Sequence, residues 1–92
     1  EAILDEEESF LYITDAESNT VNVVEIDKAK VVEQIKVGRM PGSLARDRRT
    51  QYLFVSNVQD NTVTVIDLKR LVVLKNIDVG IEPNGILCID HI

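Results

Sequence analysis

The sequence has few of the residues on which disulfides, metal sites and many catalytic sites depend. Its 92 residues include one cysteine, Cys88, and one histidine, His91. A single cysteine excludes a disulfide within the chain, and nothing offers the paired spacing of a zinc site. A histidine acting as a general base would need partners that the sequence does not supply, and no serine lies in a nucleophile-elbow motif. We therefore predict no metal, no cofactor and no catalytic residue.

Long apolar runs and an excess of basic residues are also missing. Runs such as LVVL at 71–74 fall far short of the roughly 20 residues that a membrane-spanning helix needs. The chain has 16 Asp and Glu against 10 Lys and Arg, a net charge of -6, which disfavours binding to a phosphate backbone. Arg46, Arg48 and Arg49 have no aromatic residues interleaved with them. We predict neither a membrane span nor nucleic-acid binding.

The chain is short and opens at Glu1, with no initiating methionine and no signal-peptide pattern. We interpret this start as that of a chain processed or cut from something longer. A domain of this size leaves much of its surface uncovered unless something packs against it. We therefore expect self-association, or packing against further parts of a larger protein.

A gapless internal repeat decides the fold. Residues 11–50 align with residues 53–92 at an offset of 42, and ten of the forty pairs are identical. The second copy has β-rich segments at 43–46, 52–56, 62–68 and 71–79. Asp or Asn occurs in the breaks at 47–50 and 57–61, and Gly, Pro and Asn in the break at 80–84, where they permit tight reversals; the remaining break is Lys69–Arg70. Residues 26–37 could be drawn as a short helix, but their counterpart alternates as a strand does, so we predict strands in both copies.

The middle strands are apolar at nearly every position, as in FLYIT and YLFVS, so both of their faces should contact protein. Four strands in a period near 42 are typical of a β-propeller blade. We predict an all-β chain of two blades of four-stranded antiparallel sheet, at about 2–37 and 43–79. One extra strand within 85–92 would begin a third blade. Since such strands cannot close a ring, we expect either a piece of a longer propeller or assembly with further copies.

Two motifs occur in both copies: NTV-x-V at 19–23 and 61–65, and VG-x-x-P at 37–41 and 79–83. With them, the chain resembles the YVTN family of propeller repeats over essentially its whole length, although the Pro-Asp-Gly turn of that family is missing. The resemblance implies an extracytoplasmic location, whether periplasmic, secreted or at the cell surface. It also leaves open two alternatives: part of a propeller enzyme, lactonase-like or haem-domain-like, with its site completed by other blades, or a structural surface-layer or adhesion repeat.

Acidic residues gather in two turns, and basic residues in a third. We interpret residues 5–8 as an exposed hairpin tip, and the oxygen-rich residues 15–19 as a turn, rather than as cation sites. At the 42-residue offset Glu6 corresponds to Arg48 and Glu7 to Arg49. We hypothesise that these two hairpins lie at the same edge of adjacent blades, attract each other and help to fix the order of the blades.

Our leading functional hypothesis is a non-enzymatic scaffold that presents loops to a protein or small-ligand partner. In this architecture the turns at 15–19, 39–42, 57–61 and 81–84 share one face. We predict contacts through Arg39, Met40, Asp60 and Glu82.

Overall fold

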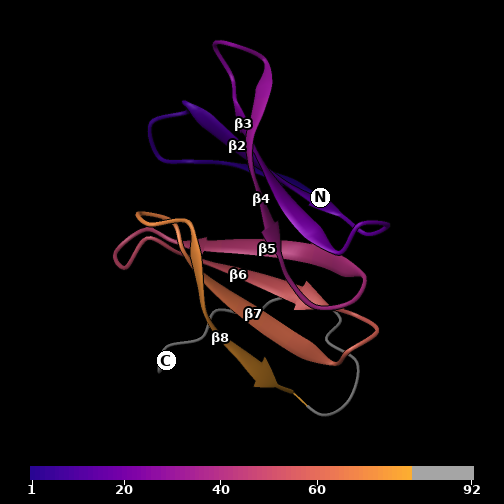
Figure 1. Ribbon diagram of the computed structural model, residues 1–92. Helices are drawn as coiled ribbons and strands as arrows, with labels where there is room; N and C mark the ends of the chain where they lie inside the picture. The colour runs from indigo at the N-terminus through magenta and orange to yellow at the C-terminus, as the bar shows by residue number, and fades with distance from the viewer. Residues whose placement is uncertain (80–92) are drawn as a thin grey trace.

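The computed structural model describes residues 1–79, which form eight β-strands and no helix. Two four-stranded antiparallel sheets follow one another along the chain, in the orders β1-β2-β3-β4 and β5-β6-β7-β8 (Figure 1). The first sheet, blade 1, contains β1 (Ala2–Leu4), β2 (Phe10–Asp15), β3 (Thr20–Glu25) and β4 (Lys30–Lys36). The second sheet, blade 2, contains β5 (Pro41–Asp47), β6 (Tyr52–Asn57), β7 (Thr62–Asp67) and β8 (Val72–Asp78).

This arrangement confirms the predicted all-β fold of four-stranded antiparallel blades. The segment 26–37 that could be drawn as a helix is a turn followed by strand β4, and its counterpart in the second copy is a turn followed by β8. No helix within residues 1–79 could cross a membrane. The expected extra strand at 85–92 and the expected contact residue Glu82 lie outside the described residues.

The internal repeat extends to irregularities of the backbone. A β-bulge interrupts the pairing of β3 with β4 between Val23 and Val24, and another interrupts β7 with β8 between Val65 and Ile66. These two sites are 42 residues apart, as are the left-handed residues Asn19 (φ 59°) and Asn61 (φ 54°). Asparagine tolerates that conformation better than most residues, so the NTV-x-V motif places a suitable residue at the end of each turn.

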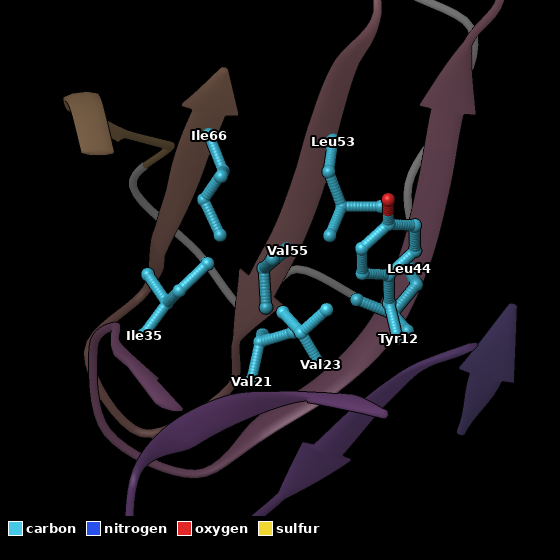
Figure 2. Packing of buried hydrophobic residues seen from close by; sticks show 8 residues of the cluster. All are labelled: Tyr12, Val21, Val23, Ile35, Leu44, Leu53, Val55 and Ile66. Atoms are coloured by element: carbon cyan, nitrogen blue, oxygen red, sulfur yellow. The ribbon is translucent and has the colours of Figure 1, made fainter. Parts of the chain in front are cut away.

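The core lies where the two blades pack together. Blade 1 contributes one set of buried side chains and blade 2 another, and Figure 2 shows the two sets meeting. The eight residues are Tyr12, Val21, Val23 and Ile35 from blade 1, and Leu44, Leu53, Val55 and Ile66 from blade 2. Side chains of neighbouring strands that lie opposite one another share a face, so each blade presents one continuous apolar surface to the other.

Blade 1 and blade 2 contact each other through different faces. A face that is covered in one blade is therefore less covered in the other, although the repeat makes the two faces equivalent in sequence. We call the face of blade 2 that packs on blade 1 the receiving face. It contains Leu53, Val55 and Ile66, each 0% exposed. Their equivalents in blade 1 at the 42-residue offset are Leu11, Ile13 and Val24, which are only partly buried.

The expectation that both faces of the middle strands are covered therefore holds for β6, where residues 53–57 are all buried. It does not hold for β2, where Tyr12 alone is buried. Within residues 1–79 no other sheet covers the receiving face of blade 1, because blade 2 packs on its opposite side.

The predicted attraction between the acidic and basic hairpins is present in one of its two pairs. Arg48 Nε lies 3.5 Å from Glu6 Oε1, and the side chains are 77% and 50% exposed. The ion pairs of the described residues do not include Glu7 with Arg49. Water surrounds the first pair, so its contribution to stability is small.

Candidate functional site: a rim of three turns

Three of the four turns expected to share a face come together in the structure. They are the β2–β3 turn at 15–19, the connection between the blades at 38–42, and the β6–β7 turn at 57–61. We call them the rim. Hydrogen bonds join the blade connection to each of the other two turns, while the fourth expected turn, at 81–84, lies outside the described residues.

Asp60 joins the β6–β7 turn to the blade connection. Its Oδ2 accepts a hydrogen bond from the backbone N–H of Arg39 at 2.8 Å, and its Oδ1 accepts one from Arg39 Nε at 3.1 Å. The backbone adds two more hydrogen bonds between the same segments, in which Val58 donates to the Met40 carbonyl and Gln59 to the Arg39 carbonyl. Two predicted contact residues therefore bind each other.

Asn19 joins the turn of blade 1 to the same connection. Its Oδ1 accepts a hydrogen bond from the backbone N–H of Met40 at 3.0 Å, and its carbonyl accepts one from Val37 N–H, also at 3.0 Å. The Met40 side chain is left 45% exposed, and Val58 beside it is 41% exposed. The exposed surface of the rim therefore includes an apolar pair, Met40 and Val58, next to the Arg39–Asp60 ion pair.

Gly38 is needed at the start of the connection because the turn packs closely upon it. A Cβ atom there would lie 2.7 Å from Asn57 Cγ and Nδ2 and 2.8 Å from Asp60 Oδ2. The repeat already marks this position, since glycine recurs at 80. Sequence reasoning assigned the glycine to a turn between blades but did not identify the side chains that exclude a larger residue.

Asn57 anchors the rim to a polar network inside blade 2 that sequence reasoning missed. Its Nδ2 donates to Thr62 Oγ1 at 3.0 Å and to Thr64 Oγ1 at 2.8 Å, and Thr64 Oγ1 donates to Asn76 Oδ1 at 2.7 Å. Asn57 and Thr64 are both 0% exposed. These bonds satisfy the Asn57 amide nitrogen and the Thr64 hydroxyl, as buried polar groups require, whereas Asn57 Oδ1 has no partner among residues 1–79.

The acidic residues that we assigned to turns do bind their own backbone. Asp15 Oδ1 accepts hydrogen bonds from the N–H groups of Glu17 and Ser18, and Asp5 Oδ1 accepts them from Ser9 and Phe10. Among residues 1–79 there is no group of three or more His, Cys, Asp or Glu that could hold a metal ion. The rim can present an apolar surface with a fixed charge pair, which suits binding.

Comparison with known proteins supports the fold. No family model matches the chain, so its resemblance to YVTN repeats stays a prediction. No curated protein matches it either. Among solved structures, the chain is similar to "Kuenenia stuttgartiensis Hydrazine Synthase", with 27% sequence identity and a TM-score of 0.84. The match covers 91% of this chain and 24% of that one, so the chain spans about a quarter of the protein it resembles, and it shares the two-sheet architecture over nearly all of its own length.

Proposed function

We propose that the chain is a non-enzymatic scaffold: two consecutive blades of a larger propeller that hold the rim in place for contact with a partner. The unequal burial of the two receiving faces carries this proposal. Leu53, Val55 and Ile66 are fully buried on the receiving face of blade 2, whereas their apolar equivalents in blade 1 are partly exposed. Blade 1 thus has the surface of a blade that takes a neighbour, and burying its apolar area would stabilise the assembly.

The neighbour can be a second copy of this chain or a blade of the same longer protein, and the solution mass of the purified chain distinguishes them. Light scattering should give a discrete multimer if copies complete the ring. Replacing Leu11 and Ile13 with glutamine should then reduce the mass to one chain. Replacing Met40 and Val58, which are 45% and 41% exposed on the rim, with glutamine is the matched control and should leave the multimer intact.

A monomeric wild-type chain would mean that the other blades belong to the same longer protein. A multimer that survives the Leu11 and Ile13 substitutions would contradict the role of the receiving face.

For the partner contact we propose Met40 and Arg39 on the rim, with Asp60 positioning Arg39, and Glu82, which lies outside the described residues. The support is exposure: Met40 is 45% exposed and the Arg39 side chain 71% exposed. Alanine at Met40 should weaken binding of a partner to the intact protein while leaving its melting temperature unchanged. Unchanged binding would contradict the assignment. The extracytoplasmic location suggested by the repeat type belongs to the same proposal.

A second candidate is part of an enzyme whose site is completed by further blades. The similarity to hydrazine synthase favours it, although the described rim contains no metal-binding group. The chain alone is then expected to be inactive. Hydrazine formation by the completed protein that contains these blades would support the enzyme, and partner binding without any turnover would support the scaffold.

A further inference from the structure

Arg46 is a charged residue on the receiving face of blade 2, beside the apolar pair Leu53 and Ile66. It lies on β5 opposite Leu53 of β6, and residues directly opposite each other share a face. Leu53 is 0% exposed and belongs to the core between the blades. The Arg46 side chain therefore points toward blade 1, although the residue is not sealed off, because it is only partly buried.

Two of the three guanidinium nitrogens of Arg46 have no partner among residues 1–79. Nε and Nη1 are enclosed and form no hydrogen bond. The ion pairs of the described residues use Arg39, Arg48 and Arg70 instead. Enclosing an unpaired charge is strongly unfavourable, so an acceptor from outside the described part of the chain is expected.

Tyr12 lies on the other side of the same boundary, with its ring facing blade 2 (Figure 2). Burial raises the pKa of its phenol, the Asp5 carboxylate raises it further, and the Arg46 guanidinium lowers it. The phenol keeps its proton near neutral pH and can donate it. Asp5 already binds the backbone N–H groups of Ser9 and Phe10, at 2.7 and 3.0 Å.

The blade architecture does not require this polar pair. At the 42-residue offset, Arg46 corresponds to Leu4 in the first copy and to Cys88 in the third, and Tyr12 corresponds to Phe54. The equivalent positions in the sequence thus carry leucine or cysteine in place of arginine, and phenylalanine in place of tyrosine. Because the repeat does not keep arginine and tyrosine at the equivalent positions, the pair is expected to have a role specific to this boundary.

We propose that Arg46 and the Tyr12 hydroxyl bind a small carboxylate at the boundary between the two blades. A planar guanidinium donates to both oxygens of a carboxylate, and the hydroxyl supplies a further donor. One guanidinium balances a singly charged anion. The nearby Asp5 carboxylate disfavours a doubly charged one, so phosphate should bind more weakly than acetate.

The test is thermal unfolding of the whole chain at neutral pH in sodium acetate, compared with sodium chloride and sodium phosphate at equal ionic strength. Acetate should raise the melting temperature of the wild type toward a plateau, as a ligand of the folded state does. Arg46→Leu and Tyr12→Phe take their replacements from the other repeats. The first should abolish the rise, and the second should weaken acetate binding by about tenfold, the effect of losing one hydrogen bond to a charged group.

Arg49→Leu is the matched control, since it removes the same charge from an exposed turn and should keep the wild-type response. An equal rise in the wild type and in Arg46→Leu would overturn the proposal, as would no rise at all or a larger rise with phosphate. If Arg46→Leu does not fold, an NMR titration of the wild type with acetate, followed at the Nε–H resonances of its arginines, tests the site instead. One of them must shift saturably with acetate, and the absence of any shift overturns the site.

Discussion

The carboxylate of Asp60 binds Arg39 through both of its oxygens, one to the backbone N–H at 2.8 Å and one to the side-chain Nε at 3.1 Å. The two residues belong to different segments, the β6–β7 turn and the connection between the blades. The Arg39 side chain is 71% exposed and that of Asp60 30% exposed. The backbone bond is independent of the Arg39 side chain, so the two halves of the contact can be separated by mutation.

Asp60→Ala should destabilise the chain by roughly 1–2 kcal/mol, because it removes both hydrogen bonds at once. Arg39→Ala keeps the backbone bond and loses only an exposed ion pair, so its cost should be below about 1 kcal/mol. Chemical denaturation of the two variants measures the difference. Equal losses of stability would show that the side-chain pair, rather than the backbone bond, holds the connection.

Gly38→Ala should destabilise the chain by about 1–3 kcal/mol, the usual range for atoms forced into a filled space. The added Cβ would lie 2.7 Å from Asn57 Cγ, and the polar network that holds Asn57 prevents it from moving away. Gly42→Ala is the control, since its Cβ would lie 3.6 Å from Val58 Cγ2. Melting temperatures should separate the two alanine variants clearly, and similar values would contradict the steric account.

Ala29→Gly should stabilise the chain slightly, by on the order of 0.5–1 kcal/mol. Ala29 ends the β3–β4 turn with φ 50°, a left-handed conformation that costs an L-residue roughly 1–2 kcal/mol. The greater freedom of glycine in the unfolded chain offsets part of this gain. Ala16→Gly changes a turn residue that is not left-handed and should destabilise. Thermal unfolding shows whether each variant melts above or below the wild type. A loss of stability in Ala29→Gly would contradict the prediction.

Reversing the charges of Arg48 and Arg49 to glutamate should lower the melting temperature, and the decrease should shrink at high salt. The Arg48–Glu6 contact is exposed, so the effect should be below about 1 kcal/mol. Combining Arg48→Glu with Glu6→Arg should restore part of the loss, because the pair is re-formed with opposite polarity. If neither melting nor its salt dependence changes, the two hairpins do not attract each other and the hypothesis is rejected.

Asp47 should make stability depend on pH on the acidic side. A hydrogen bond from Thr50 Oγ1, at 2.7 Å, and others from the backbone hold the pKa of its carboxyl below the ordinary value of 3.8. A lowered pKa in the folded state means that the carboxylate stabilises the fold above the ordinary value, and that this contribution is lost as pH falls through the lower folded value.

Asp47→Asn should therefore be less stable than the wild type at neutral pH and lose less stability between pH 5 and about pH 2. Thr50→Val should reproduce part of this behaviour. Melting temperatures over this pH range are the measurement, and parallel curves for the wild type and Asp47→Asn would contradict the assigned cause.

The repeat in the sequence was enough to predict the two blades, because each copy alternates strands with turn residues at the same offsets. It also predicted the contact between the hairpins that carry Glu6 and Arg48, since equivalent hairpins of adjacent blades lie on the same side. The partners of Arg39 and Gly38 could not be predicted in this way. Their contacts join a connection to a turn about 20 residues away, and a spacing pattern does not specify which side chain of a turn reaches across.

The sequence by itself determined the all-β class, the four strands of each blade and the positions of the turns, because alternation and turn chemistry act over a few neighbouring residues. Tertiary structure decided which face of each blade is covered. Leu11 and Leu53 are identical residues at equivalent positions, yet Leu53 is 0% exposed and Leu11 only partly buried. Burial depends on the neighbouring sheet, which for Leu53 is blade 1. The same packing turned Arg46 toward the boundary, a placement that its surroundings in the sequence do not reveal.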